Sequence, residues 1–218
     1  MSFSADVRVR LGDVEVGACF ETDGGLTVLF GPSGVGKSSV LNMVAGLLTP
    51  DTGHIRIDGD VLFDAARGVN VAPERRRTGY VFQDARLFPH RRVRENLLYG
   101  YRLAPQENRW LAVDEAVAFL GIGHLLERWP RTLSGGEARR VAIGRALLAG
   151  ARLLLLDEPL SFLDAARREE ILELIERIRD ELRVPMLYVT HDLDEAARLG
   201  TQRVELTMPA LRSTLRGA

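Results

Sequence analysis

Three short stretches of the chain are almost entirely apolar. They lie at residues 26–30, 151–157 and 184–190. Continuous apolar runs of this length, without a polar residue at every second position, are typical of strands that are buried on both faces of a parallel sheet. We therefore predict three parallel strands at the centre of the protein.

Other segments place their apolar residues on one face of a helix. Residues 38–48, 110–120 and 138–148 repeat apolar positions at helical spacing, which predicts three helices. Residues 55–63 instead alternate apolar and polar positions around an Asp-Gly pair, which is typical of a β-hairpin. The combination of buried strands and amphipathic helices predicts an α/β fold.

Composition is that of a soluble globular protein. The 218 residues are 46% hydrophobic and 27% charged, which excludes the disordered and collagen-like classes. The 29 basic and 30 acidic residues give a net charge of −1, so no overall basic field attracts nucleic acid. One cysteine excludes a disulfide framework and fits a reducing compartment. The charged N-terminus and the lack of an apolar stretch of about 18 residues predict neither secretion nor a membrane span.

Lys37 is the only lysine of the chain and lies in a glycine-rich segment, residues 31–39, which we call the phosphate loop. Its sequence, Gly-Pro-Ser-Gly-Val-Gly-Lys-Ser-Ser, matches G-x-x-x-x-G-K-[ST] between a predicted strand and a predicted helix. Backbone N–H groups and the helix N-terminus would hold phosphate oxygens, Lys37 would bridge the β- and γ-phosphates, and Ser38 would hold Mg²⁺. The predicted nucleotide contacts in this loop are Gly31, Pro32, Ser33, Gly34, Val35, Gly36, Lys37, Ser38 and Ser39. The loop alone does not separate a kinase, a GTPase and an ATPase, and a chance glycine-rich turn is the alternative.

Two acidic residues follow the four leucines of the second apolar run. Asp157 would lie at the carboxyl end of a buried strand, where open α/β sheets bind ligands, and could hold Mg²⁺. Glu158 could polarise a water molecule for attack on the γ-phosphate. The alternative is a core strand that meets solvent at an acidic turn.

Residues 133–137, Leu-Ser-Gly-Gly-Glu, open the helix predicted at 138–148, and we call them the signature segment. Exposed N–H groups and the Ser134 hydroxyl would form a second anion-binding helix end. The alternative is an ordinary helix cap in which Ser134 pairs with Glu137. Two phosphate-binding ends are one too many for a single nucleotide, so the second one would serve the nucleotide of a neighbouring copy.

His191 follows the third apolar run. Its imidazole would lie at the same edge of the sheet and could hydrogen-bond an oxygen of the γ-phosphate. A structural histidine after a strand is the alternative.

The order of these motifs resembles that of the ATP-binding subunits of ABC transporters. Two further segments carry the resemblance: Gln83 within Tyr-Val-Phe-Gln-Asp, and Leu-Ser-Phe-Leu-Asp at residues 160–164. Nearly the whole chain is covered. Residues 73–90, 133–148 and 185–190 are closely similar to the ATPase subunit of bacterial molybdate importers.

This resemblance implies a fold for the chain. It implies a single ABC ATPase domain over residues 1–218, with a P-loop NTPase (RecA-like) core formed by residues 1–83 and 151–218. The core would carry an N-terminal antiparallel β subdomain, and an α-helical subdomain would be inserted at about residues 84–150.

The family also implies roles for individual residues. Two copies would dimerise head to tail, so that the signature segment of one copy faces the phosphate loop of the other. Ser134, Gly135 and Gly136 would contact the partner's nucleotide, and Asp164 would lie at the dimer interface. Glu158 would be the catalytic base, His191 the switch histidine, and Gln83 would contact Mg²⁺ or the attacking water. The residues with an implied catalytic role are Lys37, Gln83, Glu158 and His191, and those with an implied Mg²⁺ contact are Ser38, Gln83 and Asp157.

The implied function is ATP hydrolysis, with Mg²⁺, that powers import of molybdate or a related oxyanion. The implied partners are a second ATPase subunit, two membrane permease subunits and a periplasmic or extracellular solute-binding protein, with no nucleic acid. The ATPase would be peripheral, at the cytoplasmic face of the cell (inner) membrane. A groove lined by Phe82, Leu87, Phe88 and Pro89 would receive the permease, with subdomain core as the alternative for these residues. Alternative functions are an importer for another solute, a soluble ABC-type ATPase without a permease, and a P-loop small-molecule kinase.

Several positions depart from the family pattern. Phe162 is large where small residues are usual. Residues 6–10, where the family usually carries an aromatic platform for adenine, contain no aromatic residue, so Arg8 is the candidate that would stack on the base. The chain stops at Ala218, so regulation by a further oxyanion-binding domain is not expected, and the last hairpin after residues 204–206 would be curtailed. The arginine runs at 75–77 and 91–94 are expected to be solvated surface.

Overall fold

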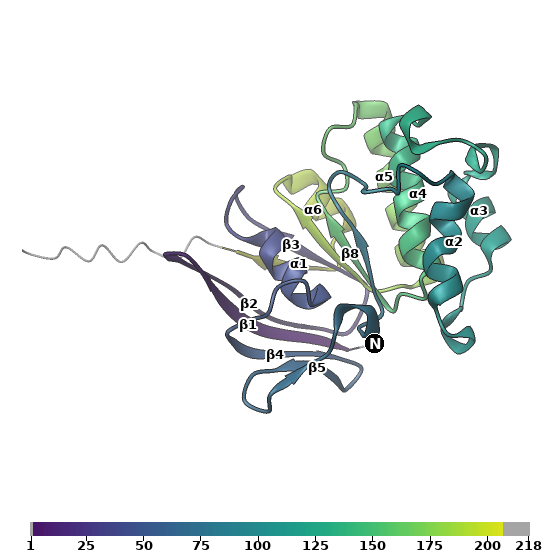
Figure 1. Ribbon diagram of the computed structural model, residues 1–218. Helices are drawn as coiled ribbons and strands as arrows, with labels where there is room; N and C mark the ends of the chain where they lie inside the picture. The colour runs from purple at the N-terminus through teal and green to yellow at the C-terminus, as the bar shows by residue number, and fades with distance from the viewer. Residues whose placement is uncertain (1, 207–218) are drawn as a thin grey trace, which may run out of the picture.

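Helix α1 (Lys37–Ala45) lies between two β-sheets in the computed structural model, which describes residues 2–206 (Figure 1). The first sheet is antiparallel and has the strand order β2-β1-β4-β5-β6. Its strands are β1 (Phe3–Leu11), β2 (Val14–Thr22), β4 (Thr52–Ile57), β5 (Asp60–Asp64) and β6 (Val69–Asn70). The predicted hairpin is confirmed: β4 and β5 pair around a turn in which Asp58 and Gly59 both have positive φ, as a two-residue hairpin turn requires.

The second sheet is parallel throughout and has the order β10-β3-β9-β8-β7. Its strands are β3 (Leu26–Phe30), β7 (Thr78–Val81), β8 (Leu153–Asp157), β9 (Met186–Thr190) and β10 (Gln202–Glu205). The three predicted central strands are therefore confirmed as β3, β8 and β9, which are adjacent in the sheet. Their carboxyl ends bring residues that are far apart in the sequence to one edge.

Both faces of this sheet are covered, which explains the unbroken leucine run of β8. Leu153 and Leu155 face the core shared with α1 and the antiparallel sheet. Leu154 and Leu156 face a second core, formed with the helices. The helices of this second core are α2 (Val93–Leu103), α3 (Val113–Leu120), α4 (Gly135–Leu148), α5 (Ala165–Arg177) and α6 (Leu193–Leu199).

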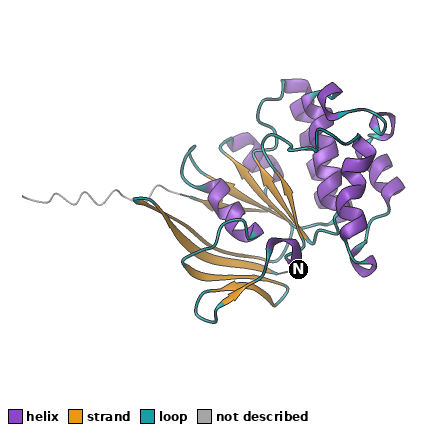
Figure 2. Ribbon diagram, in the orientation of Figure 1, coloured by secondary structure: helices purple, strands orange, loops and turns teal. Residues whose placement is uncertain are grey.

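Helices α2, α3 and α4 follow one another between β7 and β8 and gather on one side of the molecule, away from the antiparallel sheet (Figure 2). The helix predicted at 110–120 begins later, at Val113, and the one predicted at 138–148 begins earlier, at Gly135, because Ser134 caps it. Single 3-10 turns lie at Pro73–Arg75, Gln106–Asn108, Gly123–Leu125 and Pro130–Thr132, and a π-helical turn lies at Ile178–Leu182. Within residues 2–206, no helix has the length and apolar character needed to cross a membrane. The expectation about the hairpin after residues 204–206 falls mostly outside the described residues.

The expectation that residues 75–77 are solvated surface is wrong for Arg76, whose exposed fraction is 0%. Its guanidinium donates hydrogen bonds to the carbonyl oxygens of Met43 and Val44, at 2.8 and 3.0 Å, and to Asn70 Oδ1 at 2.8 Å. The first two carbonyls belong to the last turn of α1, where helical carbonyls lack partners within the helix. Arg76 therefore fastens the end of the phosphate-loop helix to the segment that follows β6.

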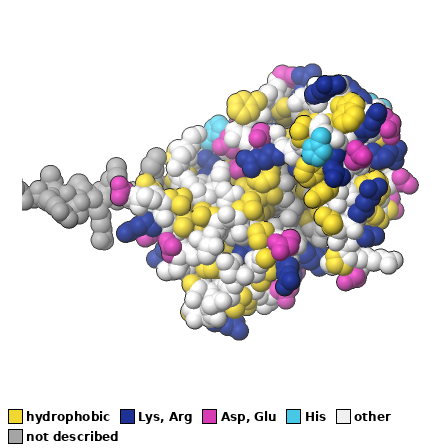
Figure 3. Space-filling model, viewed as in Figure 1, with side chains coloured by type: hydrophobic (Ala, Val, Ile, Leu, Met, Phe, Trp, Pro, Cys, Tyr) yellow, Lys and Arg dark blue, Asp and Glu magenta, His cyan; other side chains and the backbone are white. Residues whose placement is uncertain are grey.

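Charged side chains of both signs are interspersed on the face shown in Figure 3, most densely over the helical part.

Cys19 is exposed on β2.

Candidate functional site

The phosphate loop connects β3 to α1 and curls around a cavity of about 260 Å³. Gly36 has φ 101°, and a side chain on it would overlap the Cγ1 atom of Val16, so this position requires glycine. The residues that line the cavity are Ser33, Gly34, Gly36, Lys37, Ser38, Ser39 and Glu158. Among the predicted phosphate contacts, Gly31, Pro32 and Val35 do not line it.

Gly31 and Pro32 instead hold the lysine. Lys37 Nζ donates hydrogen bonds to the carbonyl oxygens of Gly31 and Pro32 at 2.8 and 3.0 Å. The ammonium is buried, and burial lowers the pKa of Lys37, with the charges of Glu158 and Asp157 acting in the opposite direction. A partly desolvated cation that is held by neutral carbonyls is well suited to bind phosphate oxygens.

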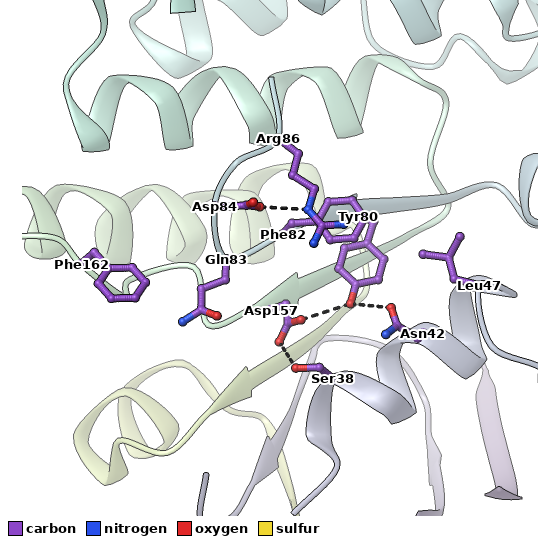
Figure 4. Close-up of a pocket in the computed structure, with 10 residues that line it drawn as sticks. All are labelled: Ser38, Asn42, Leu47, Tyr80, Phe82, Gln83, Asp84, Arg86, Asp157 and Phe162. Carbon is purple, nitrogen blue, oxygen red and sulfur yellow. Dashed lines mark hydrogen bonds and ion pairs between the residues drawn. The ribbon is translucent and has the colours of Figure 1, made fainter. Parts of the chain in front are cut away.

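Asp157, at the end of β8, lies beside the first turn of α1 (Figure 4). Its Oδ1 accepts a hydrogen bond from Ser38 Oγ at 2.9 Å. Its Oδ2 lies 3.2 Å from the hydroxyl of Tyr80, which is also 3.1 Å from Asn42 Oδ1. Burial raises the pKa of Asp157 and outweighs these hydrogen bonds, which act to lower it.

Tyr80 and Asn42 are site residues that the sequence reasoning missed. Tyr80 lies on β7, and its ring stacks on Phe82 with 4.0 Å between centroids. Burial, followed by the charge of Asp157, raises the pKa of the Tyr80 phenol, so it remains a hydrogen-bond donor at neutral pH. Its position three residues before Gln83, at the end of a strand, was the available signal.

Ser38, Gln83 and Asp157 line one cavity of about 540 Å³. They offer a hydroxyl, an amide carbonyl and a carboxylate, and these hard oxygen donors suit Mg²⁺. Within residues 2–206 no group of three or more His, Cys, Asp or Glu side chains could hold a metal ion. One carboxylate with neutral oxygens fits an ion that takes its remaining ligands from water and phosphate, as Mg²⁺ does in nucleotide sites. The residues present therefore fit the predicted ion.

Glu158 lies between Lys37 and His191. Its Oε1 is 3.9 Å from Lys37 Nζ and 3.3 Å from His191 Nδ1, and its Oε2 accepts a hydrogen bond from Ser161 Oγ at 3.0 Å. Glu158 has φ 42°, a left-handed conformation that is unfavourable for a residue with a side chain. The carboxylate is thus held in one place, next to the phosphate loop. Ser161, three residues further along the chain, was not predicted to take part.

Ser134 caps α4, as the alternative reading of the signature segment expected. Its Oγ accepts a hydrogen bond from the N–H of Glu137 at 3.3 Å, and Glu137 Oε2 accepts one from the N–H of Ser134 at 2.6 Å. The bond from the Ser134 N–H to the Glu137 carboxylate is the largest influence on the pKa of Glu137 and lowers it. Ser134 and Gly136 line a cavity of about 520 Å³.

This cavity shares no lining residue with the cavity of the phosphate loop, so one copy of the chain does not bring Ser134 to Lys37. Gly135 does not line it, because a side chain there would point at Leu163. Asp164 caps α5 and accepts a hydrogen bond from the N–H of Arg167 at 3.0 Å. The predicted site residues therefore form two groups, one around Lys37 and the other around Ser134.

Phe162 is the most exposed large apolar side chain among the described residues, with an exposed fraction of 91%. It has φ 65° and lines two cavities that Gln83 also lines. An exposed phenylalanine in a left-handed conformation is unfavourable in an isolated subunit. A large residue at this position is the departure from the family pattern that the sequence shows.

The comparison with protein families decides the class of this chain. A family model described as ABC transporter matches residues 21–161. The chain belongs to the ABC transporter family. The predicted family and the predicted P-loop NTPase fold are thereby confirmed.

Curated relatives are named for molybdenum import. The molybdenum import ATP-binding protein ModC of Brucella melitensis is 55% identical over 215 residues, which cover 99% of this chain and 59% of that protein. ModC of Mesorhizobium japonicum is 54% identical over 206 residues, which cover 94% of this chain and 56% of that protein. The chain thus spans somewhat less than three fifths of the length of these relatives.

Solved structures share the fold. The dimeric structure of MJ0796, a bacterial ABC transporter cassette, has a TM-score of 0.73 at 28% identity and covers 94% of each chain. A post-hydrolysis state of the same cassette, bound to ADP and Pi, has a TM-score of 0.72 at 29% identity and covers 95% of this chain and 94% of that one.

Proposed function

We propose that the chain is the ATP-hydrolysing subunit of an importer for molybdate or a related oxyanion. The observation that carries the proposal is the convergence of Lys37, Glu158 and His191 beside a glycine loop that fits phosphate. Lys37 is the first residue of α1, whereas Glu158 and His191 directly follow β8 and β9. The cargo is inferred from the relatives named as molybdenum import proteins.

ATP hydrolysis requires positive charge beside the phosphates and one positioned water molecule. The phosphate loop and the α1 N-terminus bind the phosphates, and Lys37 neutralises charge at the β- and γ-phosphates. Mg²⁺, when bound at Ser38, Gln83 and Asp157, supplies further positive charge to the phosphate oxygens. Glu158 orients water and accepts its proton as the water oxygen attacks the γ-phosphorus and the bond to the bridging oxygen breaks. His191 donates a hydrogen bond to the transferred group.

The separate cavity at Ser134 supports a head-to-tail homodimer. In this arrangement Ser134 and Gly136 of one copy contact the nucleotide held by Lys37 of the other, and Asp164 lies in the interface. A second copy in this arrangement would cover the exposed Phe162 and remove its apolar surface from water. The related cassette MJ0796 has been solved as a dimer.

The importer would also require two permease subunits and a solute-binding protein, with this chain at the cytoplasmic face of the membrane. Among the predicted groove residues, Pro89 is exposed and Phe88 is partly exposed, so both are available for a permease contact. The Phe88 ring packs on Tyr99 with 4.7 Å between centroids. Leu87, in contrast, packs against the helical core, as the alternative reading expected.

Phosphate release by the purified chain, with ATP and Mg²⁺, tests the proposed activity. Lys37→Ala should lose turnover, because it removes the cation from the phosphate loop; unchanged hydrolysis would exclude this loop as the site. Uptake of labelled molybdate, tungstate and sulfate by cells with and without the chain tests the cargo. Membrane fractionation with and without a co-expressed permease tests the soluble ABC-type ATPase as the second candidate.

A further inference from the structure

A buried arginine of α4 holds the backbone next to Gln83. The guanidinium of Arg139 donates hydrogen bonds to the carbonyl oxygens of Phe82 and of Gln83, the latter at 2.6 Å. We call residues 82–86 the Gln83 loop. The loop follows β7, whereas Arg139 belongs to the helix that Ser134 caps, so these bonds join two distant parts of the chain.

Arg145, further along α4, binds the rest of the loop. It donates hydrogen bonds to the carbonyl oxygens of Arg86 at 2.7 Å and of Ala85 at 3.2 Å. Ala85 and Arg86 have φ of 60° and 43°, which is unfavourable for residues other than glycine. Such a backbone persists only where its surroundings hold it. The two guanidinium groups provide these bonds.

Arg139 occupies an environment that is costly for a cation. Its exposed fraction is 4%, and burial lowers its pKa, with the charge of Asp84 acting in the opposite direction. Its Nε has no hydrogen-bond partner among residues 2–206. Since burying a guanidinium is unfavourable unless its protons are bound, the two loop carbonyls are the interactions that compensate for its position.

We propose that Arg139 is a positioning residue that fixes Gln83 relative to the catalytic centre. The Gln83 side chain lines the cavity that contains Ser38 and Asp157 (Figure 4), so a displaced loop backbone would move its amide away from both. An arginine suits this role because its planar fork binds two carbonyls at once, whereas lysine offers a single point charge. This inference rests on the proposed function for its catalytic consequence.

Kinetics of the full chain test the role. Arg139→Met should lower kcat for ATP hydrolysis by about 10- to 100-fold, the cost expected when the support of a site residue is removed, while KM for ATP stays unchanged. Arg139→Lys should recover part of the loss, because it retains one donor. Arg102→Gln, which changes an exposed arginine of α2, is the matched control and should behave as the unaltered chain does.

A double-mutant cycle separates positioning from general stability. In a Gln83→Ala background, Arg139→Met should add little further loss, because both changes act through one side chain. Losses that multiply fully would overturn the proposal, and so would an Arg139→Met variant with unchanged kcat. If Arg139→Met does not fold, Arg139→Lys takes its place: it must lower kcat by a smaller factor, and this loss must likewise nearly disappear in the Gln83→Ala background.

Hydrogen exchange without nucleotide provides a readout that does not depend on activity. Amides of residues 82–88 should exchange faster in Arg139→Met, or in Arg139→Lys, while those of α1 keep their protection. Unchanged exchange in the loop would overturn the proposal that Arg139 holds the Gln83 loop, even if the enzyme is active. The converse result is an unaltered chain that hydrolyses no ATP while its Arg139 variants show faster loop exchange. This result would refute the proposed function and still support the role of Arg139 in holding the Gln83 loop.

Discussion

Glu158 Oε1 lies 3.3 Å from His191 Nδ1, although the two residues come from the ends of different strands. Glu158 lines the cavity of the phosphate loop, and with His191 it also lines a second cavity, so the pair places a carboxylate next to the loop and an imidazole beside that carboxylate. A carboxylate in this position can take a proton from water while the imidazole contacts a transferred phosphate.

Glu158→Gln should bind ATP but hydrolyse it about 10²- to 10⁴-fold more slowly, because the amide keeps the shape of the side chain and cannot accept the proton. The variant should also accumulate as a dimer in ATP, which size-exclusion chromatography can measure. Glu173→Gln, an exposed change on α5, is the control. Wild-type turnover in Glu158→Gln would reject Glu158 as the base.

Asp157→Asn should stabilise the nucleotide-free protein at neutral pH while it lowers Mg²⁺-dependent turnover. Burial raises the pKa of Asp157, so the native state binds its proton more tightly than the unfolded state does. Stability therefore falls as pH rises from the ordinary carboxyl pKa through the raised value, and the loss persists above it. Thermal melting of Asp157→Asn and of the unaltered protein as a function of pH measures the effect. The variant should have the higher melting temperature at neutral pH, and the difference should vanish at low pH. A difference in melting temperature that is independent of pH, or of opposite sign, would contradict a raised pKa of Asp157.

Arg76→Ala should lower the free energy of unfolding by at least about 3 kcal/mol, because it leaves several buried carbonyls without donors. Denaturant unfolding measures this quantity. Arg75→Ala, at the exposed neighbouring position, is the matched control and should change stability by no more than about 0.5 kcal/mol. Equal effects of the two substitutions would mean that the bonds from Arg76 to the end of α1 contribute nothing.

Phe162→Gly should raise the melting temperature of the monomer slightly and weaken the ATP-dependent dimer. Glycine tolerates the positive φ at this position, which relieves strain of about 1 kcal/mol or more, and the substitution removes the exposed ring. Calorimetry and analytical ultracentrifugation give the two measurements. A dimer of unaltered affinity would show that the ring does not contact the second copy.

The sequence predicted those parts of the protein whose signals are local. The strand-loop-helix around Lys37, the leucine strand before Asp157 and the hairpin around Asp58 all depend on short-range pattern, and each was found where it was expected. Ser134 was also recognisable as a helix cap, because its partner Glu137 lies only three residues away.

The parts that were missed depend on contacts between distant segments. Tyr80 reaches Asp157 across neighbouring strands, and its position before Gln83 gives a signal for the site but does not identify Asp157 as its partner. Arg76 belongs to a run of three arginines that look alike in the sequence, and only the fold determines which of them enters the core. Arg139 was not singled out in the sequence, because its partners are backbone carbonyls, which have no sequence signature.

The solitary ε-amine of this chain lies in the phosphate loop, 2.8 Å from the carbonyl oxygen of Gly31. Isotope-labelled lysine would therefore give a single side-chain resonance in a magnetic-resonance experiment, free of overlap from any other position. Nucleotide loading could be followed at that one atom in the intact protein, without a chemical tag or a substitution.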